Sequence, residues 1–275
     1  MLLRGPVNPA NIAMEGEPLL RMCAPKRSTT TAKPITAILA DVKPRFLEGL
    51  APADLKVILA AARQRQFCAH SVITHYGDSA NHFFLLSKGR GRFFYVTDGG
   101  RKLLLHWFAP GQIFGVMSLL LNPSCYLVST EMVKEGSLLV WDRTVIQNLV
   151  TRYPRLAVNA LSTASEYLAL AVAAHITMTC GNARERLAEI LVSLARGIGQ
   201  RVPGGVELDV TNEELANAAN ITPFTASRLL SEWQRNGAVV KRRGNLLLVS
   251  PEHLFNARNG RGKHATKQMG TLRGR

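Results

Sequence analysis

The clearest pattern of hydrophobic and polar positions lies between residues 211 and 235 and predicts two amphipathic helices. They are separated by a turn at Asn220, a residue type that tolerates left-handed backbone angles. The first helix begins at Thr211, and Glu214 follows at the spacing of a capping box. The second begins at Thr222, with Pro223 at its first helical position. Such a pair is typical of a helix-turn-helix, which places its second helix in the DNA major groove. An ordinary helical hairpin within a larger domain is the alternative.

The second predicted helix has an apolar inward face and an outward face without acids. Its inward residues are Ala226, Leu229, Leu230 and Trp233, which recur at helical spacing. After this helix, two apolar runs flank a basic segment, and this pattern predicts a hairpin, or wing, with a basic tip. The predicted DNA contacts are Thr211, Thr222, Pro223, Phe224, Thr225, Ser227, Arg228, Lys241, Arg242 and Arg243.

Between Arg65 and Trp141 the apolar residues come in short runs that are punctuated by glycine. Asp98-Gly99-Gly100 between two such runs is a strong hairpin signal. Short strands at this spacing predict a β-barrel or jelly roll. The predicted strands lie near Gln66–Phe67 and at Val72–Thr74, His82–Leu86, Gly91–Thr97, Lys102–Phe108, Leu127–Val133 and Gly136–Val140, and a small helix is expected at Met117–Leu121.

Helical sequence follows from Asp142 to about Thr179, with a break near Tyr153-Pro154. Between Arg155 and Arg184 the only formal charge is Glu166. A helix with so little charge must be covered on more than one side, and its own barrel and a second copy of the chain are the simplest cover. A core helix of a monomer is the alternative, and the polar residues along the segment argue against a membrane span. The predicted dimer seam is Leu161, Leu168, Val172 and His175.

Composition favours a polyanionic partner. The 275 residues carry a formal net charge of +15, which points to nucleic acid before an anionic membrane surface. The four cysteines are scattered, and this spacing favours a reducing cytoplasm over a disulfide or zinc framework. The start of the chain, MLLRGPVNPA, lacks the apolar region of a signal peptide, and no run is apolar enough for a credible membrane span.

Together these patterns predict an α+β chain: an N-terminal β-barrel or jelly roll, a long dimerisation helix and a C-terminal winged helix-turn-helix. The expected parts are a flexible extension (1–40), an effector-type barrel (46–142), a dimerisation region (143–180), a DNA-binding domain (181–254) and a basic disordered tail (255–275).

This order of parts resembles the Crp/Fnr family of bacterial transcription regulators over roughly residues 46 to 254. The most specific residues are Arg186-Leu187-Ala188, Thr211 with Glu214-Leu215-Ala216, Thr222-x-x-Thr225-x-Ser227-Arg228-x-Leu230, and Gly237. In the barrel, Gly77-Asp78, Gly89, Gly111 and Phe114-Gly115 fall where the family keeps its turns. The resemblance implies that Arg228 contacts guanine, which suits a guanidinium facing O6 and N7. It also places Thr222 and Thr225 near the phosphates.

The effector site departs from the pattern of the family's cyclic-nucleotide binders. Aligned on Gly111 and Gly115, the ribose-binding glutamate is replaced by Val116, and Tyr126 and Leu127 replace the arginine and serine that hold the cyclic phosphate. The closely spaced cysteines that hold an iron–sulfur cluster in oxygen-sensing members are also missing. The candidate effector pocket is Gly115, Val116, Met117, Tyr126 and Leu127.

We therefore expect a cytoplasmic, non-enzymatic regulator that binds a palindromic DNA operator as a homodimer and does not respond to cyclic AMP. No cofactor or membrane partner is expected, and RNA polymerase is a candidate partner. One alternative keeps the DNA binding and adds a haem or a redox thiol, for which Cys180 is the candidate. A remote alternative is a cupin-type metalloenzyme that uses His70, His75, His82 and His106, although their spacing matches no metal motif.

Overall fold

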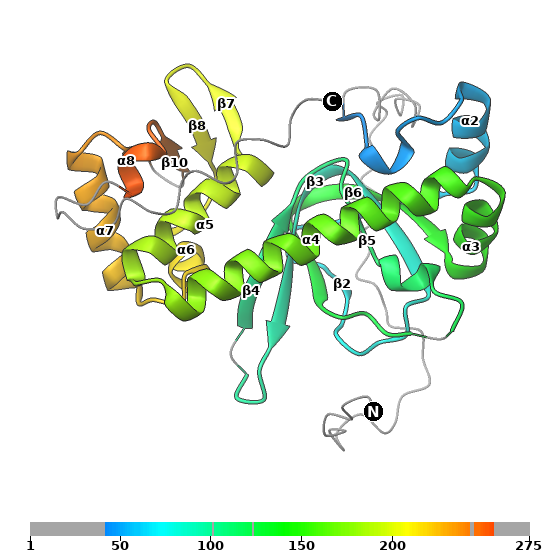
Figure 1. Ribbon diagram of the computed structural model, residues 1–275, viewed down its shortest axis with the longest axis horizontal. Helices are drawn as coiled ribbons and strands as arrows, with labels where there is room; N and C mark the ends of the chain where they lie inside the picture. Colours follow the sequence, from blue (N-terminus) through cyan, green and yellow to red (C-terminus); the bar gives the residue numbers. More distant parts are fainter. Residues whose placement is uncertain (1–41, 101, 123, 243–244, 256–275) are drawn as a thin grey trace. The chain divides into compact units, whose positions relative to one another are not determined.

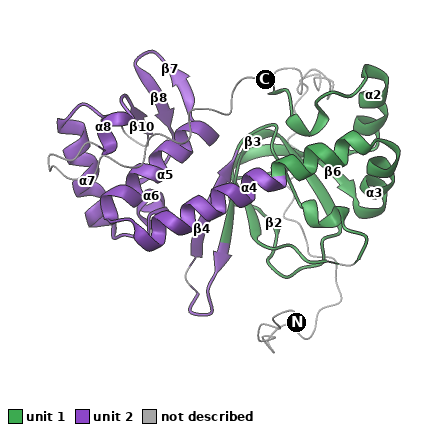
Figure 2. Cartoon of the chain, in the orientation of Figure 1, with its two compact units in different colours: residues 1–94, 109–163 green, residues 95–108, 164–275 purple. Residues whose placement is uncertain are grey.

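The computed structural model describes residues 42–255, except 101, 123, 243 and 244 (Figure 1). Its residues group into two compact units (Figure 2). One unit comprises the residues up to Phe94 together with Ala109–Thr163, and the other comprises Tyr95–Phe108 and the residues from Ala164 onward. The predicted extension and basic tail lie outside the described residues, apart from Phe255.

The first unit contains most of an antiparallel sheet. Its strands follow the order β1-β6-β3-β4, with β2 paired to β6 and β5 paired to β3. The described path is open and does not close into a barrel, which is consistent with the predicted jelly roll. The α+β class is as predicted. The strands are β1 (Arg63–Phe67), β2 (Val72–Thr74), β3 (His82–Val96), β4 (Lys102–Phe108), β5 (Ile113–Phe114) and β6 (Ser129–Asp142).

Two strands continue through positions where the glycine pattern predicted breaks. β3 is one strand of 15 residues and β6 one strand of 14, and their register shifts between Leu86 and Gly91. A Cβ atom at Gly89 would lie 2.8 Å from the backbone oxygen of Glu135, and one at Gly136 would lie 2.0 Å from that of Lys88. The glycines therefore allow two backbones to approach closely at a β-bulge, and they do not end the strands.

Helices and the sheet share one hydrophobic core in this unit. The helices are η2 (Arg45–Leu47), α2 (Pro52–Ala60), η3 (Val116–Leu119), α3 (Arg143–Arg152) and the N-terminal part of α4 (Pro154–Cys180). Trp141 of β6 is fully buried, and its indole N–H donates to the backbone oxygen of Ile58 at 2.9 Å. Asn159 of α4 donates to the backbone oxygens of Phe46 and Glu48, both at 2.9 Å. The first bond ties α2 to the sheet, and the other two tie α4 to η2.

The second unit contains the predicted two-helix motif and wing. α5 (Ala183–Gly197), α6 (Asn212–Ala218) and α7 (Pro223–Arg235) precede β9 (Val239–Arg242) and β10 (Asn245–Leu248), and α8 (Glu252–Phe255) ends the described chain. Before the two-helix motif, residues 200–208 form a hairpin of β7 (Gln200–Val202) and β8 (Gly205–Leu208). The sheet order is β7-β8-β10-β9, so this hairpin extends the wing.

One expectation from composition is corrected, namely that the cysteines form no disulfide. Cys68 is disulfide-bonded, whereas Cys125 and Cys180 are free. Scattered spacing does not keep distant cysteines apart in a fold, because the bond depends on spatial geometry. In addition, α4 is long and apolar enough to cross a membrane by these two criteria, although one such helix is weak evidence for a span. Only 17% of its most apolar window is buried.

Candidate nucleic-acid interface

The first helix of the motif begins with a complete capping box. The Thr211 hydroxyl accepts from the backbone N–H of Glu214 at 3.2 Å, and the Glu214 carboxylate accepts from the N–H of Thr211 at 2.9 Å. The chain then turns at Asn220, whose φ is +50°. Both features are as predicted, and they show that Thr211 acts in helix capping.

The second helix is fixed at its start and along its inner face. Thr222 is the N-cap of α7, and its hydroxyl accepts from the N–H of Thr225 at 3.1 Å. The two threonine hydroxyls are 2.9 Å apart. The inward residues Ala226, Leu229, Leu230 and Trp233 are all buried, as predicted. The Trp233 indole N–H also donates to the backbone oxygen of Leu254 at 3.2 Å, which ties α8 to this helix.

The outward face of α7 carries the remaining predicted contacts on that helix. Thr222, Pro223, Phe224 and Arg228 are exposed, whereas Thr225 and Ser227 are half-buried. Phe224 is the most exposed aromatic residue of the described chain, with 79% of its surface accessible. The exposed residues cluster in the N-terminal half of the helix, which is the part that contacts base edges in a helix-turn-helix.

Lys241 of the wing is held against the recognition helix. Its ammonium donates to the Ser231 hydroxyl at 2.8 Å and to the backbone oxygen of Ser227 at 3.3 Å. Desolvation lowers the pKa of Lys241. This contact between wing and helix has no signature in sequence spacing, because it joins residues that only the fold brings together.

The other two basic wing residues differ from Lys241. Arg242 is exposed, and its guanidinium lies 3.5 Å from the carboxylate of Glu207 on β8. Arg243 lies outside the described residues. Among the described residues of the wing, Arg242 is therefore a cation that can exchange a partly exposed ion pair for a phosphate, because ion pairs near the surface contribute little stability.

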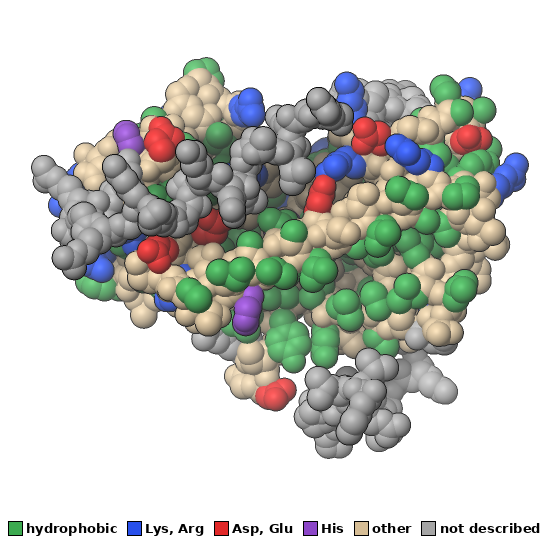
Figure 3. All heavy atoms as spheres, in the orientation of Figure 1, with side chains coloured by type: hydrophobic (Ala, Val, Ile, Leu, Met, Phe, Trp, Pro, Cys, Tyr) green, Lys and Arg blue, Asp and Glu red, His purple; other side chains and the backbone are tan. Residues whose placement is uncertain are grey.

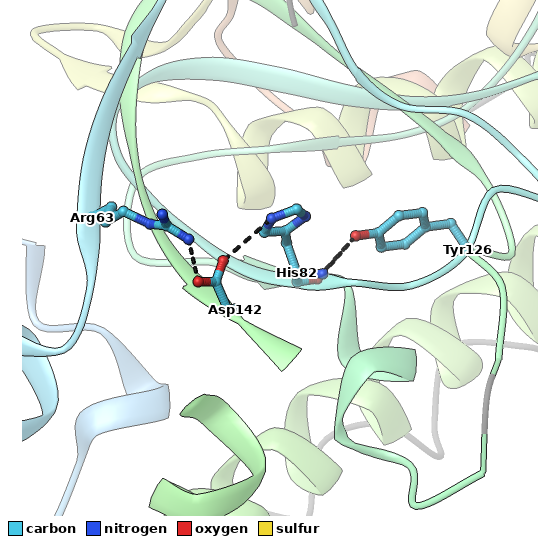
Figure 4. Close-up of polar contacts among 4 residues, drawn as sticks. All are labelled: Arg63, His82, Tyr126 and Asp142. Atoms are coloured by element: carbon cyan, nitrogen blue, oxygen red, sulfur yellow. Dashed lines mark hydrogen bonds and ion pairs between the residues drawn. The ribbon is translucent and has the colours of Figure 1, made fainter. Parts of the chain in front are cut away.

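The candidate effector residues lie in the first unit, and the structure brings some of them together. Gly115 has a φ of +77°, and a Cβ atom there would lie 3.5 Å from the Tyr126 ring. Tyr126 is buried, and its hydroxyl accepts from the backbone N–H of His82 at 3.0 Å and donates to the backbone oxygen of His82 at 3.1 Å (Figure 4). Burial raises the pKa of Tyr126 to about 12. Leu127, by contrast, is 64% exposed.

An aromatic cluster packs beside Tyr126. The rings of Phe84 and Phe114 stack with centroids 4.5 Å apart, and the Phe84 and Tyr126 centroids are 6.4 Å apart. Phe93 meets Phe114 edge-on at 6.2 Å. The region around Tyr126 is therefore filled by aromatic side chains that pack on one another.

Several nearby charged groups are paired with one another. Arg92 of β3 forms an ion pair with Glu131, its cross-strand partner on β6, and the Glu131 side chain is only 5% exposed. His82 Nε2 lies 3.3 Å from an oxygen of Asp142, which also binds Arg63 (Figure 4). In the part of the chain that the structure describes, no three histidine, cysteine or acidic side chains converge as metal ligands. The cupin alternative therefore has no ligand set among those residues.

Comparison with known proteins decides the family. The cyclic nucleotide-binding domain model matches residues 64–153, and the Crp-like helix-turn-helix domain model matches residues 185–256. The Cyclic AMP receptor protein of Thermus thermophilus is 29% identical over 195 residues, which cover 70% of this chain and 87% of that protein. The chain belongs to the Crp/Fnr family. It is thus a transcription regulator with a DNA-binding helix-turn-helix domain.

Other Crp/Fnr proteins share the fold at lower identity. The nitrogen fixation regulation protein FixK of Rhizobium meliloti is 24% identical over 181 residues, covering 65% of this chain and 79% of that protein. The solved structure of the c-di-GMP responsive global regulator CLP of Xanthomonas campestris superposes with a TM-score of 0.62 at 20% identity. It covers 72% of this chain and 99% of that one. At this identity the likeness shows the fold alone.

Two arginines stabilise the helix-turn-helix of this Crp/Fnr protein. Arg186, part of the sequence motif that carried the resemblance, donates to the backbone oxygens of Ala219 and Gly181, both at 2.9 Å. It therefore ties the turn between α6 and α7 to the end of α4. Arg184 pairs with Glu232, and its guanidinium lies 5.5 Å from the Trp233 ring centroid. Arg184 was not predicted, since its partners lie more than forty residues away in the sequence.

The predicted dimer seam lies along α4. Leu161, Leu168 and Val172 are 68%, 67% and 52% exposed, and His175 is exposed as well. Val158 and Ile176 add further exposed apolar surface to the same helix. Hydrophobic side chains gather along this helix in the space-filling view (Figure 3). Such a surface needs a cover, because large contiguous apolar patches on soluble proteins mark interaction sites.

Proposed function

We propose that this regulator is a homodimer that binds a two-fold-symmetric DNA operator and takes no cyclic nucleotide as effector. The observation that carries the proposal of a homodimer is the exposed apolar stripe of α4, which is formed by Val158, Leu161, Leu168 and Val172. Glu166 is the only formally charged side chain on the helix beyond Arg155, so exposure of this surface to water is unfavourable. Contact with the same stripe of a second chain would remove this apolar surface from water.

The spacing of the stripe indicates how two copies would pack. Val158, Leu161, Leu168 and Val172 lie three, seven and four residues apart, which fits positions a and d in a heptad repeat. Valine is found at a positions and leucine at d positions, a combination that favours two parallel strands. The a positions are Val158, Ser165, Val172 and Thr179, and the d positions are Leu161, Leu168 and His175.

A parallel dimer would present two copies of the helix-turn-helix to DNA. Helix-turn-helix dimers bind two half-sites whose symmetry mirrors that of the protein. The net charge of +15 favours the approach to a polyanion. The proposal includes a cytoplasmic location and RNA polymerase as a further partner, because a regulator of this family acts on transcription. Insertion of α4 into a membrane is the competing use of its apolar surface.

Sedimentation equilibrium and selection of binding sites from random duplexes test the proposal together. We expect a mass of two chains without detergent and a selected sequence with two inverted half-sites about one helical turn apart. A monomer, or a selected site without inverted symmetry, would contradict the homodimer. Partition of the protein into lipid vesicles would favour the membrane alternative.

The absence of a cyclic-nucleotide response is the second part of the proposal. A buried phosphate charge must be paired or strongly hydrogen-bonded, because desolvation otherwise opposes binding. The Tyr126 hydroxyl is engaged with the backbone of His82, and Arg92 is engaged with Glu131. Val116 has no polar group for a ribose hydroxyl. These residues support the proposal even though a relative is named a cyclic AMP receptor protein.

Titration calorimetry with cyclic AMP and cyclic GMP checks this expectation. We expect no binding up to millimolar nucleotide and no change in operator affinity measured with and without it. A micromolar dissociation constant, or operator affinity that rises with either nucleotide, would overturn this part and leave the DNA-binding part intact. A nucleotide-responsive member of the family is the positive control for both measurements.

A further inference from the structure

Phe224 presents a large apolar side chain on the outward face of the recognition helix. It is 79% exposed, and it follows Pro223 in the first turn of α7. Its backbone is well fixed, because Thr222 caps this turn and the proline restricts the first helical residue. An exposed aromatic ring on a rigid turn is suited to contact a partner with little loss of conformational freedom.

The polar side chains around Phe224 are engaged in holding the helix. The hydroxyls of Thr222 and Thr225 bond to each other, and the Ser231 hydroxyl bonds to the backbone oxygen of Ser227 and accepts from Lys241. Arg228, by contrast, is exposed and four residues after Phe224, so both lie on the same side of the helix. Phe224 and Arg228 are therefore the pair on this face that is best placed to touch base edges.

The chemistry of the pair differs in a way that the major groove distinguishes. A guanidinium matches the two acceptors of guanine, whereas an apolar ring matches the 5-methyl group of thymine. Four residues along a helix correspond to a rise of about 6 Å, and successive base pairs are ~3.4 Å apart. The two side chains thus reach bases that are one or two base pairs apart.

We propose that Phe224 is a specificity-determining residue that packs against a thymine methyl group one or two base pairs from the guanine contacted by Arg228. This inference rests on the proposed DNA binding and specifies which base Phe224 recognises. Burial of one methyl group contributes about 0.8 kcal/mol, which is a factor of ~4 in affinity.

Replacement of thymine by uracil isolates the methyl group. The operator is first selected from random duplexes with the wild-type protein, and uracil then replaces each thymine of one half-site in turn. We expect one replacement to weaken wild-type binding about fourfold and to leave the Phe224→Ala variant unaffected. Phe224→Leu should keep part of the difference, because leucine still offers an apolar contact. Phe255→Ala is the matched control, since this 49% exposed phenylalanine lies on α8, and it should keep the wild-type ratio.

Each outcome bears on a different claim. A uracil effect of equal size in wild type and Phe224→Ala would overturn the contact, and so would an operator at which every uracil is neutral. A protein that selects no duplex at all would contradict DNA binding and the contact together. Because Phe224 is largely exposed, circular dichroism of the variant should match wild type, so an affinity change would not reflect unfolding.

Discussion

The Leu168→Glu variant is expected to be a monomer that no longer binds its operator specifically. Leu168 occupies a central d position of the proposed seam and is 67% exposed in a single chain. In a two-fold dimer the two glutamates would face each other across the axis, where desolvation and like-charge repulsion both oppose association. A monomer with one helix-turn-helix also loses the gain in affinity that comes from linking two binding modules, which is typically a factor of 10² to 10⁴.

Sedimentation equilibrium and operator binding by fluorescence anisotropy check this expectation. Leu170→Glu is the matched control, because Leu170 is also exposed but lies two residues away on the opposite side of the helix. The control should remain dimeric and bind DNA normally. A dimeric Leu168→Glu variant would contradict the seam, and monomers of both variants would show that the assignment of faces is wrong.

The Arg228→Ala variant is expected to lose about 1–3 kcal/mol of binding to its operator and to relax the preference at one position of each half-site. The reason is that a bidentate contact to guanine discriminates against other bases, whereas binding to random DNA depends mainly on phosphate contacts. Competition between operator and random duplexes, followed by renewed site selection with the variant, measures both effects. Equal weakening on specific and random DNA would contradict the base-reading role.

A wing variant provides the contrast. Arg242→Ala should weaken binding to operator and random DNA alike and reduce the dependence of affinity on salt, because an exposed wing cation contacts phosphates. Lys241 is a poorer choice for this comparison. Its ammonium is bonded to Ser227 and Ser231, so its replacement also disturbs the orientation of the wing on α7.

The elements with local signals were predictable from sequence. The capping box at Thr211 and Glu214 and the Thr222-Pro223 start of α7 depend on residues within one turn, and the structure has both. The glycines in the β-region misled the strand prediction, because Gly89 and Gly136 serve a close approach between two strands. That function depends on the partner strand and not on the glycine's neighbours in sequence.

The candidate sites show the same division. The outward face of α7 follows from helical periodicity, so its exposed residues could be named in advance. The contact of Lys241 with Ser231 and the clamp of Arg186 on Ala219 join segments that are separate in sequence. No spacing rule reveals such contacts, because they arise from packing of the wing and of α5 against the two-helix motif.

The proposed dimer is held by the charge-poor surface of α4, whereas DNA binding depends on the positive charge of the chain. Changes in temperature and salt should therefore act on dimer association and on DNA binding in opposite directions. Association through apolar surface has a negative heat-capacity change, weakens on cooling and is strengthened by strongly hydrated salts such as sulfate. DNA binding by a chain with a net charge of +15 instead weakens steeply as salt concentration rises. Binding releases counterions from the DNA, and this release is less favourable when the salt concentration is already high. A warm solution with added sulfate should therefore hold free dimers, whereas a cold solution of low ionic strength should hold DNA complexes in which the seam is the weaker contact.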